Sequence, residues 1–180
     1  MTKPQLTAAA RLAELEWRWK TFDELTSTEV YAMLAARSAV FVIEQNCLYG
    51  DIDGLDIDAW HLLAFGATTD ATANANPTAT AITRTTRPPL AGYLRVLLPD
   101  ADDRDIRIGR VLTTAQFRGI GLGNAMLDRA IAHIRKQWPG TPIRLHAQAH
   151  LQRFYGAFGF APVSGIHEED GIPHVWMRSA

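Results

Sequence analysis

Apolar and polar residues alternate in several short runs of the chain, and each run predicts a β-strand. These strands are expected at residues 16–22, 60–66, 90–98, 107–114, 143–148, 160–165 and 172–177. Two longer segments place apolar residues at intervals of three and four, which predicts helices over residues 26–45 and 119–138. A short third helix is expected over residues 151–158. Strands around a central strand-turn-helix unit indicate an α/β (α+β) domain, with a mixed sheet flanked by helices.

Local signals support both long helices. Thr26 and Glu29 have the spacing of a capping box, which marks the start of the first helix. Pro139 and Gly140 end the second. The residues of the second helix expected to face the core are Leu122, Met126, Leu127, Ala130, Ile131 and Ile134. Gly109, inside a predicted strand, suggests either a β-bulge or a close packing contact.

The chain of 180 residues has the length of one globular domain, predicted at residues 16–180. Residues 1–15 are expected to be a flexible, at most weakly helical, extension. Residues 68–89 are biased toward Ala, Thr, Asn and Pro and can bury little apolar surface. We therefore expect them to form an exposed loop inserted between two strands.

Charge and composition exclude several classes of protein. A formal net charge of −1 argues against a nucleic-acid partner, because nucleic-acid-binding domains usually carry a basic excess. No stretch approaches the roughly 18 apolar residues of a membrane span, so no membrane partner is expected. Cys47 is the only cysteine and cannot form an internal disulfide, which favours a cytoplasmic location. The apolar final strands could pair across a homodimer or simply complete the sheet.

The segment Arg118-Gly119-Ile120-Gly121-Leu122-Gly123 joins a predicted strand to the second long helix. Glycines allow a tight turn, and the amides that open a helix favour an anion such as a pyrophosphate. A plain strand-to-helix turn is the alternative. The segment is not a Walker loop, because Asn124 follows where Lys-Ser or Lys-Thr is needed, and its glycines do not have the Rossmann spacing.

The pattern Arg-x-x-Gly-x-Gly is followed about thirty residues later by Gln152-Arg153-Phe154-Tyr155-Gly156-Ala157-Phe158-Gly159-Phe160. In this order the two motifs resemble those of the GNAT family of acyl-CoA-dependent N-acyltransferases, and the surrounding sequence looks most similar to the ElaA-type branch. The resemblance covers residues 17–178. It implies the GNAT fold, in which a mixed, mostly antiparallel sheet flanked by helices has a splayed strand pair that receives acyl-CoA.

The resemblance also implies site residues. The positions that match the family's cofactor contacts are Val111, Leu112, Thr113, Arg118, Gly119, Ile120, Gly121, Leu122, Gly123 and Asn124. Tyr155 matches the general acid that serves the departing thiolate; its phenol, with an ordinary pKa of about 10, is protonated at neutral pH. Gln148 stands where many members have an asparagine that contacts the cofactor or holds the tyrosine.

The general base is less clearly marked, because the strand over residues 143–147 has no carboxylate. Glu44 is the first candidate and His146 the second, with His150 and His174 behind them. The need for a base depends on the acceptor: deprotonating a lysine amine at pH 7 costs about 4 to 5 kcal/mol, an α-amine about 1.

The loop that contains Asp51, Asp53, Asp56 and Asp58 could attract a cationic amine or be a solvated turn. Its spacing does not fit a calcium loop. No metal site is predicted, because His146 and His150 lack a nearby third ligand in the sequence.

These features predict an N-acetyltransferase that moves the acetyl group of acetyl-CoA directly to a primary amine, on a small molecule or a peptide, with Tyr155 as general acid. The alternative is a non-catalytic acyl-CoA sensor with the same cradle. A third hypothesis, acyl-homoserine-lactone synthesis, is favoured by the helix segment 37–41 but opposed by the complete motif around Tyr155.

Overall fold

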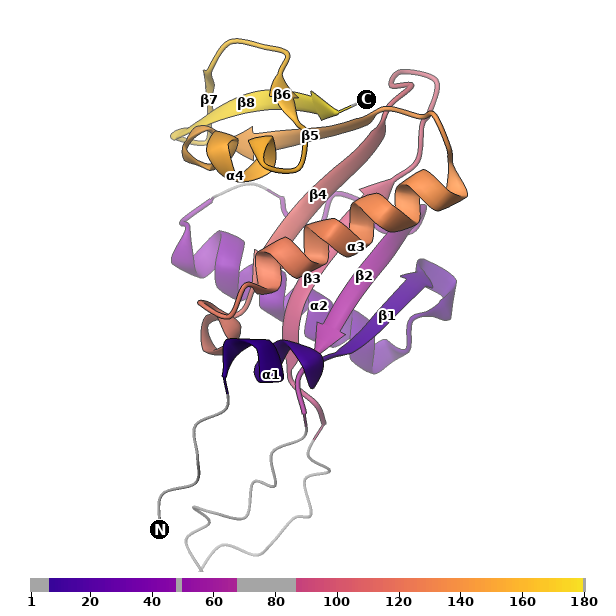
Figure 1. The fold of residues 1–180 in the computed structure, drawn as a ribbon, viewed down its shortest axis with the longest axis vertical. Coiled ribbons are helices and arrows are strands. Elements are labelled where there is room, and N and C mark those ends of the chain that lie inside the picture. Colours follow the sequence, from indigo (N-terminus) through magenta and orange to yellow (C-terminus); the bar gives the residue numbers. More distant parts are fainter. Residues whose placement is uncertain (1–6, 48–49, 68–86, 180) are drawn as a thin grey trace, which may run out of the picture.

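The computed structural model describes residues 7–47, 50–67 and 87–179. The chain forms an eight-stranded sheet in the order β1-β2-β3-β4-β5-β8-β6, with β7 paired to β8 (Figure 1). The strands are β1 (Glu16–Thr21), β2 (Ala59–Phe65), β3 (Leu90–Leu97), β4 (Ile106–Thr113), β5 (Ile143–Gln148), β6 (Ala161–Pro162), β7 (His167–Glu169) and β8 (Ile172–Ser179). Every neighbouring pair is antiparallel except β4 and β5. The predicted mixed, mostly antiparallel sheet is confirmed.

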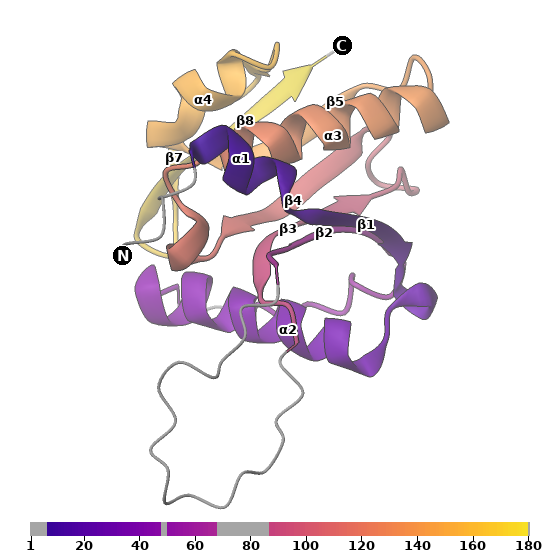
Figure 2. The same cartoon turned by 60° about the horizontal axis from the view of Figure 1, so that its bottom comes forward.

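Helices cover both faces of this sheet (Figure 2). The helix α2 (Ser27–Arg37) continues into a π-helix, η2 (Ser38–Glu44), and both lie on one face. The opposite face carries α1 (Ala8–Ala13) and α3 (Leu122–Gln137). The short helix α4 (Gln152–Gly156) lies near β5 and β8 at one end of the sheet (Figure 1). Short 3-10 turns η1 (Phe22–Glu24), η4 (Ala115–Phe117) and η5 (Ala149–Leu151) complete the described elements.

Two apolar clusters follow from this layering. The larger one joins the sheet to α3, and all six residues predicted to face inward from this helix are buried. The smaller one joins the other face to Met33, Val40 and Phe41 of α2 and η2. The capping box at Thr26 and Glu29 is present, so the local signal and the packed structure agree on where α2 begins.

The sheet opens between β4 and β5. Their parallel pairing covers only Ile106 to Ile108 against Ile143 to Leu145, and beyond these residues the strands separate. The pairing of β3 with β4 also shifts register, between Tyr93 and Arg95, which places a bulge beside Gly109. The left-handed conformation falls on the next residue, Arg110, at φ 52°, and not on the glycine. The bulge expected at Gly109 is therefore present, and the strained residue is an arginine.

Three details differ from the expectations. Part of the predicted N-terminal extension is ordered, because residues 8–13 form α1, Leu12 packs on the core and Leu15 is buried. The helix expected to run to residue 45 changes to π geometry at Ser38. Of the strand expected at residues 160–165 only the two-residue β6 forms, and β7, which lies beyond that range, was not predicted.

Most of the predicted loop insertion, residues 68–86, lies outside the described residues. Within the described ranges, no helix combines the length and apolar character of a membrane span.

Candidate active site

A cavity of about 420 Å³ lies where β4 and β5 separate. Its walls include Gly109, Arg110 and Val111 from β4 and Leu145, His146 and Gln148 from β5. Tyr155 closes it from α4, and Gln45 and Cys47 close it from the end of the η2 segment. Where β4 and β5 diverge and stop pairing, the opening of the sheet becomes a chamber with polar and apolar walls.

A second, open groove lies at the N-terminus of α3. It is lined by Thr113, Phe117, Arg118, Gly119, Gly121, Leu122, Gly123, Asn124 and Phe154. Gly119 and Gly121 both have left-handed backbones, at φ 76° and 81°, which a residue with a Cβ rarely adopts. Gly121 is the N-cap of α3, so the first-turn amides that follow it point away from the helix. These amides and the helix dipole suit a phosphate group.

The side chains of the predicted cofactor residues point in different directions. Leu112, Ile120 and Leu122 are buried and belong to the apolar clusters, so a cofactor could contact these residues only through their backbone. Val111 lines the cavity, and Thr113 and Asn124 line the groove.

Phe154 and Tyr155, neighbours in the sequence, connect the two spaces: Phe154 lines the groove, and Tyr155 lines the cavity. Tyr155 is only 7 % exposed and packs edge to face on Phe154 and Phe160. Burial raises the pKa of its phenol to about 12. Helix α4 ends because Gly159, at φ 86°, turns the chain back toward β6. Tyr155 is therefore a neutral hydroxyl held in a fixed place at neutral pH.

Glu44 and Arg118, predicted as base and cofactor residue, bind each other. Both carboxylate oxygens of Glu44 accept hydrogen bonds from Arg118, each at 2.8 Å. Arg118 also donates to the carbonyl of Thr113 at 3.1 Å. The hydrogen bond from Arg118 lowers the pKa of the Glu44 carboxyl. The pair ties the end of η2 to the glycine-rich turn, and Glu44 is not among the residues that line the cavity.

Gln148 makes a second link across the site. Its side-chain amide donates to Oε1 of Gln45 at 3.0 Å, so the end of β5 is bound to the end of η2. Gln45 follows directly on the π-helix, whose wider turn sets the direction of the residues after it. Such single π-turns are rare and often occur at functional sites.

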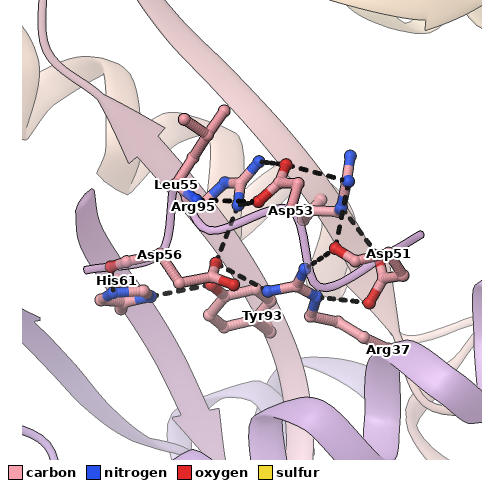
Figure 3. Close-up of polar contacts among 9 residues, drawn as sticks. Arg37, Asp51, Asp53, Leu55, Asp56, His61, Tyr93 and Arg95 are labelled. Carbon is pink, nitrogen blue, oxygen red and sulfur yellow. Dashed lines mark hydrogen bonds and ion pairs between the residues drawn. The ribbon is translucent and has the colours of Figure 1, made fainter. Parts of the chain in front are cut away.

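Two of the four aspartates in the aspartate-rich loop are neither solvated nor free anions. Asp51 and Asp56 are buried, and both bind Arg37, which is fully buried, at 2.8 and 2.7 Å (Figure 3). Arg95 binds Asp53 and Asp56 at 2.6 and 2.8 Å. Both expectations for this loop are therefore wrong for Asp51 and Asp56, because arginines far away in the sequence neutralise them.

Further residues attach this network to the cavity. Arg110, the residue with the left-handed backbone, forms ion pairs with Asp51 at 2.8 Å and with Asp53 at 3.2 Å. His61, which is also buried, lies 2.8 Å from the hydroxyl of Tyr93 and 3.0 Å from the carbonyl of Asp56. Burial lowers the pKa of His61. We define the Arg-Asp network as Arg37, Asp51, Asp53, Asp56, Arg95 and Arg110.

The histidines on the other side of the cavity form a separate group. His146 is 20 % exposed at its side chain, and its ring stacks on Trp176 with centroids 4.3 Å apart. Its Nδ1 lies 3.0 Å from Glu169, and its Nε2 lies 2.9 Å from Nε2 of His167. No metal site was expected, because the sequence offers no third ligand near His146 and His150. In the fold, His167 and Glu169 lie next to His146 and form a group that could hold a metal ion.

Sequence reasoning missed His167, Glu169 and Asp170, although one signal was present. Asp170-Gly171 is a strong two-residue hairpin signal, and both residues adopt positive φ, at 51° and 76°. That turn fixes the register of β7 on β8 and places His167 opposite His174. The pairing of β8 with β5, which sets His146 opposite Trp176, joins distant segments and has no such local signal.

Comparison with known proteins agrees with this geometry. Residues 68–180 match the family model described as an acetyltransferase (GNAT) domain. The chain is 38 % identical to protein ElaA of Escherichia coli over 163 residues, which are 91 % of this chain and 95 % of ElaA. A crystal structure of ElaA superposes with a TM-score of 0.75, covering 92 % of this chain and 99 % of the other.

An acyl-CoA N-acyltransferase from Pseudomonas aeruginosa superposes with a TM-score of 0.77 at 39 % identity, covering 92 % and 99 % of the two chains. The splayed strands, the glycine turn that opens α3 and the tyrosine between them are thus found in a chain that belongs to the GNAT family of acetyltransferases and is related to ElaA.

Proposed function

We propose that this chain transfers the acetyl group of acetyl-CoA directly to a primary amine. One observation carries the proposal: consecutive residues, Phe154 and Tyr155, line the groove at α3 and the cavity between β4 and β5. A cofactor whose pyrophosphate lies on the α3 amides can extend its pantetheine arm past Thr113 and Val111 toward Tyr155. The thioester would then lie in the cavity where the strands separate.

The reaction needs two proton movements. The nitrogen lone pair of the amine attacks the thioester carbonyl carbon, a C–N bond forms, and the C–S bond then breaks. The Tyr155 hydroxyl donates a hydrogen bond to the departing sulfur and supplies its proton, which solvent restores. The high pKa of Tyr155 keeps the hydroxyl protonated, and the cavity in which it is buried limits access of water to the thioester.

The amine must lose a proton as it attacks, and the positions of the two candidate bases favour one of them. Glu44 uses both carboxylate oxygens to bind Arg118 and does not line the cavity. His146 does line it, on the strand that faces Tyr155. We therefore assign the proton to His146, directly or through water, and give Glu44 the task of holding Arg118 at the glycine turn.

The acceptor is expected to be cationic in solution. Glu169 and Asp170 line the cavity beside His146, whereas the carboxylate of Asp53 is already paired with Arg95 and Arg110. Attraction of an ammonium group thus falls to the β7-β8 turn and not to the aspartate-rich loop.

Release of free CoA thiol from acetyl-CoA, measured against a panel of peptides, polyamines and small amines, tests this proposal. The wild-type protein is expected to release thiol only with an amine, and Tyr155→Phe is expected to lower kcat by about 100-fold or more, because an acid in position contributes on that scale. Tyr31→Phe is the matched control, since Tyr31 is 76 % exposed on α2. Mass analysis of the product identifies the acceptor.

A non-catalytic acyl-CoA sensor would give a different result. It would bind CoA and gain thermal stability from it, yet show no amine-dependent thiol release with any acceptor. Tyr155→Phe would leave its CoA affinity unchanged. That combination would overturn the transferase proposal.

A further inference from the structure

Two histidine nitrogens lie close together beside the cavity, which His146 lines. Nε2 of His146 and Nε2 of His167 are 2.9 Å apart, on β5 and β7. A contact this short between two nitrogens needs a hydrogen or a cation between them, because two lone pairs repel.

The partners of the other ring nitrogens decide which atom carries each proton. Nδ1 of His146 lies 3.0 Å from a carboxylate oxygen of Glu169, and Nδ1 of His167 lies 3.2 Å from the carbonyl of Gly165. Both partners are acceptors, so each Nδ1 carries the N–H that donates to them. In their neutral forms, both rings then present the Nε2 lone pair to the other.

This arrangement is typical of histidines that bind a metal. Ligating imidazoles usually donate their second N–H to a carboxylate or a backbone carbonyl, and this bond fixes the tautomer and the ring orientation. Here His146 has the carboxylate partner and His167 has the carbonyl partner. One ligand atom from each of His146, His167 and Glu169 lies within 4.8 Å of the others.

The distances suit a small cation after a minor adjustment. Zinc binds histidine nitrogen at about 2.0 to 2.1 Å, and tetrahedral geometry then separates two such nitrogens by about 3.3 Å. The observed 2.9 Å is shorter by a few tenths of an ångström. His167 and Glu169 are exposed on the β7-β8 hairpin and can move by this amount, while stacking on Trp176 holds the ring of His146.

We propose that His146 and His167 form a binding site for a divalent first-row transition ion such as Zn²⁺. Glu169 supplies the carboxylate that accepts the Nδ1–H of His146 and so orients its ring. Imidazole donors select zinc, nickel or copper over Mg²⁺, which prefers oxygen ligands. The site takes residues from β5 and β7, so it exists only in the folded chain.

The site shares His146 with the cavity that holds Tyr155. An ion bound there would occupy the nitrogen to which we assign the amine proton. Zinc would therefore inhibit acetyl transfer, and removal of zinc by EDTA would restore it. This consequence rests on the proposed function, whereas metal binding does not.

Calorimetric titration of the untagged full chain with ZnCl₂, without acetyl-CoA, tests the site. We expect one zinc ion per chain, no binding of MgCl₂, and a Kd raised at least 100-fold in His167→Ala. Glu169→Gln should raise the Kd about 10- to 100-fold, the usual effect of losing a partner of a ligating histidine. The control is His150→Ala, an exposed histidine on η5 that is outside the cluster and should leave the Kd unchanged.

Cobalt gives a second readout that needs no substitution. Co²⁺ bound by nitrogen ligands should give visible absorption bands in the wild-type protein, and Zn²⁺ should remove them. The proposal is wrong if the wild-type protein binds neither ion, or if His167→Ala binds zinc as the wild-type protein does. Either result would mean that the two histidines share a proton instead. If the wild-type protein binds zinc but, free of zinc, transfers no acetyl group to any amine, only the function proposed above is overturned.

Discussion

Two polar clusters face each other across the cavity, and they are built in opposite ways. In the Arg-Asp network, three arginines meet three aspartates, and Arg37 is fully buried. In the histidine cluster, Nε2 of His146 and Nε2 of His167 lie 2.9 Å apart, beside a carboxylate that is 55 % exposed. The first cluster satisfies its charges within the chain. The second brings two ring nitrogens together with room for a ligand from outside the chain.

This difference indicates different tasks. Charges that are paired and buried cannot bind a ligand without breaking the fold, since each unpaired buried charge costs several kcal/mol. The Arg-Asp network thus supports the site by holding Arg110 in its left-handed conformation at the bulge of β4. The histidine cluster has two of its members, His167 and Glu169, on an exposed hairpin and can accept a ligand at little cost to the fold. The number of charged residues in a cluster is therefore a poor guide to whether it binds anything.

The largest expected effect comes from breaking the network at its centre. Arg37→Met should lower the free energy of unfolding by about 3 to 5 kcal/mol, because Asp51 and Asp56 lose a buried partner. Denaturant titration measures this loss. The matched control is Arg107→Met, which removes an arginine paired with the half-exposed Asp100 and should cost less than about 1 kcal/mol. Equal losses in the two variants would show that the network does not stabilise the fold.

A smaller effect is expected at the partly exposed edge of the network. Burial opposes ionisation of Asp53, but hydrogen bonds from Arg95 and from the amide of Leu55 outweigh it and lower the pKa to about 2. The folded pKa lies below the ordinary 3.8, so the stabilisation is present above pH 3.8 and is lost as the pH falls toward 2. Asp53→Asn should cost about 1 kcal/mol at pH 7, after allowance for its exposure.

Unfolding curves of wild-type protein and Asp53→Asn between pH 7 and pH 2 measure this contribution. The difference between the two proteins should shrink as the pH falls through this window. Asp58→Asn, an exposed change in the same loop, should show no such trend. A difference that stays constant with pH would contradict the ionised pairing of Asp53.

The smallest effect on stability is expected in the histidine cluster. His167→Ala should change the free energy of unfolding by less than about 0.5 kcal/mol, because His167 is exposed on a short hairpin. Denaturant titration in the presence of EDTA measures this value. A loss of 2 kcal/mol or more would show that the cluster, like the Arg-Asp network, serves mainly the fold, and would remove the contrast between them.

Features that depend on residues close together in the sequence could be predicted, and features that depend on distant residues could not. The capping box at Thr26, the glycine turn before α3 and the inward face of α3 are local patterns, and the structure has each of them where the sequence indicates. The π-turn at η2 gives no signal in hydrophobic spacing, because it adds a single residue to a turn of a continuous helix. The strand expected at residues 160–165 is reduced to the short β6, and β7, which the hairpin turn at Asp170-Gly171 pairs with β8, was not predicted.

The sequence alone determined most of the order of strands and helices, the GNAT family and the segments that form the glycine turn and carry Tyr155, because these depend on residues close together in the chain. Only the tertiary structure decided the partners of the charged side chains. Glu44 meets Arg118, the aspartates meet Arg37 and Arg95, and His146 meets His167. Such contacts join strands whose pairing depends on the packing of the whole sheet, and no local pattern of residues encodes them.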